Sequence, residues 1–409
     1  SALQVMCHAT AAAAAKGTGT GAATAAAPST SIGYRQSEKA AAAAHKVAQE
    51  GEATQGLAQI ITHIAAYLQQ HQPQEAAAAA AAASAAAAAP SAPPPPSAAA
   101  GADAAPAADR TASGAHASSS GSGSGAAIAS GGGGSSSPGC SAAAYVAVLK
   151  PLQVDAVSGL DKAGAHHYAN SVRNESHVPK TRAMRLAKEV ASLESLLPLS
   201  PSSSVFVRVD EGAVQLWKAI VIGPEDTPYS GGCFVFDFYF PPQYPNSPPQ
   251  VHLVTTGGGR VRFNPNLYAE GKVCLSLLGT WSGDRGEQWN ADVSTAVQVL
   301  ISIQSLIMVP EPYFNEPSYE GQTDERGKTA SREYNKAVRE NCVRYAMLDV
   351  LRHPPACLAE VVRGHFRLRR EALLAQIKSW ADEGRQHDSG HAGRLMDMRK
   401  ELETLIAAL

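Results

Sequence analysis

The composition of this chain changes abruptly near residue 140, and that change decides where a folded core can form. Residues 1–140 consist mainly of Ala, Ser, Gly and Pro, with runs such as PPPP at 93–96 and GGGG at 131–134. A segment of that composition cannot bury enough apolar side chain to offset its chain entropy. We therefore expect residues 1–140 to be a mostly disordered, low-complexity region, and the fold to lie after it.

One stretch of this region stands apart from the rest. Its apolar residues recur at helical spacing with Gln and His between them, and they are Leu57, Ile60, Ile61, Ile64 and Leu68. That spacing predicts one amphipathic helix near residues 54–70, either docked on another surface or formed transiently.

Charge and hydropathy exclude several classes of partner. The formal net charge is -2, so we expect neither nucleic acid nor an anionic membrane as the main partner. No apolar stretch approaches the roughly 18 residues that a membrane span needs. The N-terminus lacks the basic-then-apolar order of a secretory signal, and the chain begins with Ser1, which fits a fragment or a processed chain.

The cysteines give no sign of a metal site. None forms a CxxC pair, and they are scattered at Cys7, Cys140, Cys233, Cys274, Cys342 and Cys357. Zinc sites and disulfide frameworks use closely or regularly spaced cysteines, so we expect no metal, no other cofactor and reduced thiols. Reduced thiols are typical of a cytoplasmic protein, and that location also suits a reactive cysteine.

Ordinary globular sequence begins near residue 181, and its pattern predicts an α+β fold. Residues 182–190 carry apolar positions at helical spacing and predict a helix. Short connections join four predicted strands into an antiparallel meander; the strands are residues 205–209, 215–222, 234–240 and 251–255. An aromatic stripe on the third strand is expected to be core. Helical patterns then follow at residues 297–306, 331–352, 354–380 and 391–409.

Cys274 is the residue best suited to chemistry. It lies in residues 264–278, NPNLYAEGKVCLSLL, after an Asn-Pro-Asn turn and a loop that contains Gly. A thiolate presented beside a side-chain amide suits acyl transfer through a thioester, because the thiolate carries the acyl group while the amide stabilises an oxyanion. Taken alone, Cys274 also fits a small buried apolar residue.

Residues 180–345 resemble the core of the ubiquitin-conjugating enzymes. The resemblance rests on the helix and the meander, the turn YPNSPP at 244–249, the Asn-Pro-Asn turn before Cys274, Trp289 and the helical segment SIQSL at 302–306. Three further runs are similar to the very large, BRUCE (Apollon)-type members, which combine conjugating enzyme and ligase: SSSVFVR at 202–208, RFNPNLY at 262–268 and PYFNEP at 312–317. The resemblance implies a lead segment at 141–180, a conjugating core at 181–345 and a C-terminal helical extension at 346–409.

The resemblance also implies partners and site residues. Cys274 would take ubiquitin as a thioester from the ubiquitin-activating enzyme and pass it to lysines of substrate proteins. Asn266 would steady the oxyanion, and Asn264 stands where the family has a mainly structural His. Glu316 matches the acidic or polar residue beside the thioester, although Asp is usual there and Glu316 also fits a solvated loop carboxylate. The first helix, which meets the activating enzyme in the family, includes Arg182, Arg185 and Lys188.

Two departures from small family members bear on specificity. Residues 279–288, GTWSGDRGEQ, form a longer insertion between Cys274 and Trp289, which either shapes substrate approach or is a plain surface loop. Asn246 replaces the aromatic of the Pro-rich turn, and residues 290–292 (NAD) replace Ser-Pro-Ala, both positions that grip RING ligases in the family. Dependence on a RING ligase is therefore doubtful, and a hybrid that selects its own substrates is favoured.

The alternatives differ in chemistry. A catalytically inactive ubiquitin-binding scaffold would use the same fold, but such members lack the cysteine. An active enzyme for another ubiquitin-like modifier remains open. Four arginines of the extension predict either a solvated basic face or a docking surface for ubiquitin or substrate; they are Arg363, Arg367, Arg369 and Arg370.

Overall fold

The computed structural model describes residues 140–281, 287–322, 324–385 and 388–409. The predicted low-complexity region therefore lies outside the described residues except for Cys140, and so does the predicted helix near residues 54–70. The middle of the predicted insertion, residues 282–286, also lies outside them.

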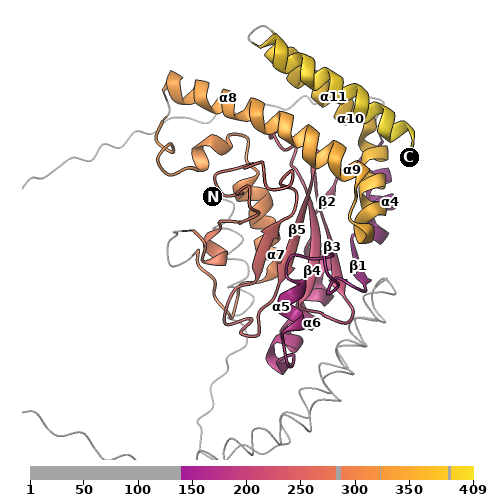
Figure 1. The fold of residues 1–409 in the computed structure, drawn as a ribbon, viewed down its shortest axis with the longest axis vertical. Helices are drawn as coiled ribbons and strands as arrows, with labels where there is room; N and C mark the ends of the chain where they lie inside the picture. The colour runs from indigo at the N-terminus through magenta and orange to yellow at the C-terminus, as the bar shows by residue number, and fades with distance from the viewer. Residues whose placement is uncertain (1–139, 282–286, 323, 386–387) are drawn as a thin grey trace, which may run out of the picture. The chain divides into compact units, whose positions relative to one another are not determined.

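The predicted antiparallel meander is present. Its strands are β3 (Ser203–Asp210), β4 (Leu216–Ile222), β5 (Cys233–Tyr239) and β6 (Gln250–Leu253), and each runs antiparallel to the next. Cross-strand neighbours are mostly β-branched or aromatic, as pleated, buried strands favour. The confirmed meander forms the centre of the sheet (Figure 1).

Two strands that we did not predict extend this sheet. β1 (Val154–Val157) pairs in parallel with β3, and β2 (Leu199–Ser200) pairs antiparallel with its start. The sheet is therefore mixed and has the order β1-β3-β4-β5-β6, with β2 on β3. β1 belongs to the lead segment, so this segment is part of the folded unit.

The helices confirm the α+β class, and each predicted helical pattern of the folded region corresponds to at least one of them. In chain order the helices are α4 (Ala142–Leu149), α5 (Ala169–Arg173), α6 (Lys180–Leu196), α7 (Ala296–Ser302), α8 (Glu325–Asn341), α9 (Val350–Arg352), α10 (Ala359–Gly384) and α11 (Ser389–Ala407). Two π-helical segments continue α7 and α8, at Ile303–Ile307 and Cys342–Asp349. Thr295 caps α7 in a capping box with Gln298, which fixes where this helix begins.

Both faces of the interior strand β5 are buried. Phe234, Phe236 and Phe238 on one face are wholly buried, which confirms the aromatic stripe as core. On the other face Val235 and Asp237 are each only 2% exposed. The second face of the sheet is therefore covered as well, and the contacts of Asp237 show that the lead segment forms part of this cover.

The C-terminal extension shares the core of the conjugating fold. Helices α10 and α11 lie side by side (Figure 1). Their apolar residues belong to the same buried cluster as the sheet, among them Leu374, Trp380, Leu395 and Leu402. The extension is therefore part of the same hydrophobic core as the sheet.

The four arginines of α10 all have partners within the chain. Arg363 pairs with Glu360 and Arg369 with Glu225, while Arg370 pairs with both Glu371 and Glu403. Arg367 donates to the carbonyl oxygen of Leu409. These pairings neutralise much of the predicted basic face and tie α10 to its neighbours, although exposed ion pairs of this kind add little stability.

Helix α6, the first helix of the predicted conjugating core, uses Arg182 and Arg185 for contacts within the protein. Arg182 is wholly buried and donates to Phe240 O at 2.8 Å and to Glu175 Oε1 at 3.0 Å. Although Arg182 belongs to the helix that meets the activating enzyme in the family, its side chain is therefore not exposed for such a contact. Lys188 is exposed and remains available.

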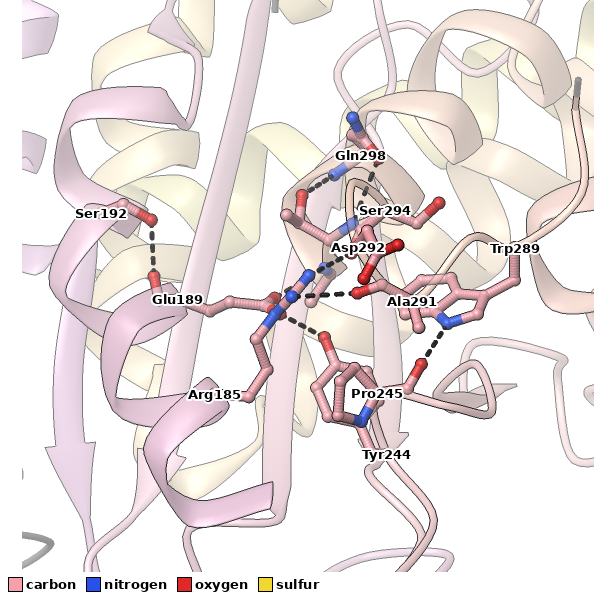
Figure 2. Close-up of polar contacts among 12 residues, drawn as sticks. Arg185, Glu189, Ser192, Tyr244, Pro245, Trp289, Ala291, Asp292, Ser294 and Gln298 are labelled. Atoms are coloured by element: carbon pink, nitrogen blue, oxygen red, sulfur yellow. Dashed lines mark hydrogen bonds and ion pairs between the residues drawn. The ribbon is translucent and has the colours of Figure 1, made fainter. Parts of the chain in front are cut away.

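Arg185 and Glu189 join α6 to the Pro-rich turn and to the loop after Trp289 (Figure 2). Arg185 Nε donates to Glu189 Oε1 at 2.6 Å, and its Nη1 donates to Ala291 O at 3.1 Å. Tyr244 donates its hydroxyl to the same carboxylate, while Glu189 Oε2 accepts from the backbone of Ala296 at 2.8 Å. One carboxylate, 4% exposed, therefore connects three segments of the core.

We expect Glu189→Ala to lower the free energy of unfolding by about 3 kcal/mol, because removal of one member of a buried ion pair leaves its partners unpaired. Urea denaturation measures the change. Lys188→Ala, one residue away and exposed, is the matched control and should change the free energy by less than about 0.5 kcal/mol. Equal effects of the two substitutions would contradict a structural role for the Glu189 network.

Candidate active site

The structure brings Cys274 and Asn266 together through two hydrogen bonds. The backbone N–H of Cys274 donates to Asn266 O at 2.9 Å, and Asn266 Nδ2 donates to Cys274 O at 3.0 Å. The chain between them folds back on itself, since Tyr268 N donates to Lys272 O at 3.0 Å. The side-chain amide and the thiol predicted from the sequence therefore belong to one closed loop.

Asn264 fixes the beginning of this loop from inside the core. Its side chain is wholly buried, and its Nδ2 donates to Ile307 O at 2.7 Å and to Tyr229 Oη at 3.0 Å. Its Oδ1 accepts the backbone N–H of Asn266 at 2.8 Å. Asn264 therefore performs the structural part that the resemblance implies for this position.

The thiol of Cys274 is held mainly in its protonated form. The residue is 2% exposed, and burial raises the pKa of the thiol above its ordinary value. The positive charge of Lys272 and a hydrogen bond with Tyr268 partly offset this rise in pKa. Arg262 lowers the pKa of the thiol further, and the carboxylate of Glu270 raises it. Burial outweighs the two cations, so the thiolate is a minor form at neutral pH.

Glu316 lies beside this loop but is joined to it through Arg262. It follows the 3₁₀ turn Pro312–Asn315, and its carboxylate is 3.5 Å from Arg262 Nη2. The guanidinium of Arg262 in turn lies 4.4 Å from the ring centroid of Tyr268 and donates to Pro265 O. Among the described contacts of Glu316 there is no hydrogen bond to Cys274, so any effect on the thiol passes through Arg262.

Three residues around the thiol were missed as site residues by the sequence reasoning, namely Arg262, Tyr268 and Lys272. Both cations lie over the ring of Tyr268, with Lys272 Nζ at 5.5 Å from its centroid. The signal was present in the sequence, because Arg262 precedes Tyr268 and Lys272 follows it. Their convergence on one ring depends on the reversal of the chain, which the spacing alone did not show. Residues 266–274, which contain Tyr268 and Lys272 and end at Cys274, are called the thiol loop below.

The start of the predicted insertion is attached to the thiol loop. Thr280 Oγ1 donates to Val273 O at 2.8 Å and accepts the backbone N–H of Leu275 at 3.0 Å. These bonds flank Cys274 on both sides along the chain. The insertion therefore begins as a brace of the site, while residues 282–286 lie outside the described part of the chain.

Comparison with known proteins agrees with this geometry. Residues 185–342 match the family model described as "Ubiquitin-conjugating enzyme". These residues belong to the ubiquitin-conjugating enzyme family.

Proteins similar to this chain include much longer ones. The human "Dual E2 ubiquitin-conjugating enzyme/E3 ubiquitin-protein ligase BIRC6" is 48% identical over 263 residues, which are 62% of this chain and 5% of that protein. The mouse protein of the same name is 50% identical over 263 residues, with the same coverage. The "Probable ubiquitin-conjugating enzyme protein 17" of Caenorhabditis elegans is 48% identical over 204 residues, covering 50% of this chain and 28% of that protein. The resemblance to the large members is thereby confirmed, and this chain spans about a twentieth of the length of the mammalian ones.

Among solved structures, the E2 domain of a Toxoplasma gondii ubiquitin-conjugating enzyme is similar to this chain, with 26% sequence identity and a TM-score of 0.29. The match covers 40% of this chain and 97% of that domain.

Within the described residues, no helix has both the length and the apolar character to cross a membrane.

Proposed function

We propose that this chain accepts ubiquitin as a thioester on Cys274 and transfers it to lysines of protein substrates. The observation that carries the proposal is the closed loop in which Asn266 and Cys274 bond to each other, with Lys272 and Arg262 placed around the thiol. A catalytically inactive binding module has no use for a thiol flanked by an amide and two cations.

The first step is an exchange of thioesters. The Cys274 thiolate attacks the carbonyl carbon of ubiquitin held on the activating enzyme, a new C–S bond forms, and the thiolate of the activating enzyme leaves. The exchange is nearly balanced in energy, and its rate depends on the thiolate fraction and on access to the thiol. Lys272 and Arg262 stabilise the attacking thiolate, while burial of Cys274 limits access to a partner that fits the loop.

The second step forms the amide bond. A neutral lysine amine attacks the thioester carbonyl, the C–N bond forms, the C–S bond breaks, and the excess proton leaves the amine. Asn266 Nδ2 uses one N–H for Cys274 O, so its other N–H is available for the oxyanion. Asn266 Oδ1 is buried and accepts no hydrogen bond within the described part of the chain, which suits it to receive an N–H of the incoming amine.

Glu316 acts in this scheme on the acceptor lysine rather than on the thiol. Its carboxylate is about one-third exposed and faces Arg262, so it lies at the rim of the site and not in its interior. The ammonium of an acceptor lysine that approaches from solvent meets this carboxylate first. Desolvation of that ammonium near the thioester then favours the neutral amine. The alternative of a solvated loop carboxylate without a role predicts no loss of transfer on substitution of Glu316.

We expect Cys274→Ala to abolish a reductant-sensitive ubiquitin adduct and Cys274→Ser to convert it into a reductant-resistant ester. The chain is mixed with ubiquitin, ATP and the ubiquitin-activating enzyme, and the adduct is resolved on gels with and without reductant. The thioester and the oxyester differ in their stability to thiols, which gives the two variants opposite readouts.

Cys357→Ser is the matched control for charging, because Cys357 is another free thiol, more exposed than Cys274, that should not carry ubiquitin. An adduct that survives in Cys274→Ala would overturn the assignment of the nucleophile. No adduct with ubiquitin, but one with another ubiquitin-like modifier, would support the alternative substrate. No adduct with any modifier would leave the inactive scaffold as the better reading.

We expect Asn266→Ala to slow transfer from the preformed thioester to free lysine by on the order of a hundredfold, because an oxyanion donor is lost. Single-turnover discharge measures transfer separately from charging. Thermal unfolding of the variant tests whether the loop merely collapses. A charging rate that falls as steeply as the discharge rate would contradict a role confined to the second step.

We further propose that substrate selection lies within the chain or its full-length protein, as in a hybrid conjugating enzyme and ligase. Support comes from Asn246 in the Pro-rich turn and from residues 290–292. Arg185 donates to the carbonyl oxygen of Ala291, and Ser294 accepts the backbone N–H of Asn290, so these bonds hold residues 290–292 in place.

The measurement is discharge of the thioester with and without a RING domain. We expect less than a twofold change, and a many-fold acceleration would refute independence from RING ligases. A cytoplasmic location and the lack of a nucleic-acid partner stay predictions.

A further inference from the structure

A row of polar residues crosses the sheet on the face away from α6 and ends at the thiol loop. Successive strands place Arg208, Lys218, Asp237 and His252 directly opposite one another, and an isolated bridge then pairs His252 with Lys272. Strand residues that are charged usually face solvent, but the first three are each at most 5% exposed. A cover of polar segments must therefore satisfy this row.

The lead segment provides that cover at the end of the row nearest the site. His166 Nε2 lies 3.0 Å from Trp217 O and 3.7 Å from Asp237 Oδ1. The backbone N–H of His167 donates to Asp237 Oδ2 at 2.7 Å. Lys218 pairs with the other oxygen of the same carboxylate. Asp237 thus fixes the height at which the His167 side chain lies over the sheet.

His167 stacks on His252 of strand β6. The two rings are parallel to within 8°, and their centroids are 3.6 Å apart. Tyr168 meets the edge of His167 and stacks on Tyr239, so the ring of His167 is fixed on several sides. The stack lines a groove of about 620 Å³ together with Lys272 and Val273 of the thiol loop and Thr280 of the insertion.

The thiol loop also packs closely against the ring of His252, at Gly271. Gly271 has a positive φ of 89°, and a Cβ built there would lie 2.2 Å from Cε1 of His252. Leu253 N donates to Gly271 O at 2.8 Å, so backbone and ring together define the path of the loop. The position of Gly271 and Lys272 therefore depends on where the His252 ring lies.

We propose that the lead segment is a working part of the active site, and that His167 is a positioning residue which, by stacking on His252, holds Lys272 next to Cys274. The inference rests on the proposed role of Cys274 as the thiol that carries ubiquitin. It assigns to a segment outside the family core an effect on the reactivity of the thiol that acts through His252 and Lys272.

Charged and titratable groups surround both the His167–His252 pair and the Cys274 thiol. Around the histidine pair they are His166 of the lead segment, Lys218 of β4 and Asp237 of β5. Around the thiol they are Lys272, Tyr268, Arg262 and Glu270. Of the groups that lower the pKa of the thiol, Lys272 acts most strongly, so a loop that moves Lys272 away raises this pKa. The sign of the effect is therefore fixed: loss of the stack shifts thiol reactivity to higher pH.

The test is alkylation of Cys274 by iodoacetamide as a function of pH in the full chain, measured by peptide mass spectrometry. We expect His167→Ala to move the alkylation profile to higher pH, in the direction of Lys272→Gln. His167→Phe, which keeps an aromatic ring for the stack, should restore the profile. His177→Ala, an exposed histidine near the end of the same segment, is the matched control and should leave the profile unchanged.

A double substitution separates positioning from general loosening. If His167 acts through Lys272, His167→Ala combined with Lys272→Gln shifts the profile no further than Lys272→Gln alone. Additive shifts, or an unchanged profile in His167→Ala, would overturn the proposal. Thermal unfolding accompanies each variant, and if His167→Ala loses the fold, His252→Gln removes the stack from the strand side and carries the same test.

Charging with ubiquitin supplies the second readout. We expect His167→Ala to lower kcat on the order of tenfold by displacing the loop, with little change in KM in the reaction with the activating enzyme, since the described contacts of His167 are with Asp237, Tyr168 and His252 and not with α6. A change in KM alone would overturn the proposal. If the wild-type chain forms no thioester, the proposed function fails, whereas the alkylation profiles still decide whether His167 positions the loop.

Discussion

The wholly buried amide of Asn264 is the interaction on which the site depends. A side-chain amide offers two donor hydrogens and two acceptor lone pairs, and here all four are used. Nδ2 bonds Tyr229 and Ile307, and Oδ1 accepts from Asn266 at 2.8 Å and from Asn315 at 3.4 Å. A neutral imidazole has one donor and one acceptor, so an amide at this position connects more segments than the usual His of the family would.

These four bonds place the chemistry relative to the core. The connection between β4 and β5 (through Tyr229), the π-helical segment that continues α7 and the turn before Glu316 all meet at the same buried amide. Asn266 then orients the carbonyl of Cys274, and Cys274 returns a hydrogen bond to the backbone of Asn266. A disturbance in any of these three segments therefore reaches the loop that carries Cys274 through one or two hydrogen bonds.

Much of the fold followed from the sequence because its signals are local. Alternation at Val205, Val207 and Val209 identified β3, and helical spacing identified α6. Strand β1 was missed since it has only four residues and gains its place from a parallel partner about 50 positions later. Burial of Arg182 did not follow from the sequence, because periodicity reports apolar positions and does not show that Glu175 makes burial of a guanidinium tolerable. The cations around the thiol were missed for a similar reason, since only the reversed loop brings Arg262 and Lys272 to one ring.

Burial and charge act in opposite directions on Cys274, and the balance fits transfer better than hydrolysis. Among the described residues that act on its charge there is no histidine to serve as a general base, only cations, a tyrosine and a carboxylate. A buried thiol without such a base is a slow nucleophile toward small molecules, and water that approaches its thioester is poorly activated. When a lysine attacks instead, Lys272 and Arg262 stabilise the thiolate as it leaves. In the proposed function, a thioester at this site would thus be poorly activated toward water, while a neutral amine, which needs no base to attack, could still displace the thiolate.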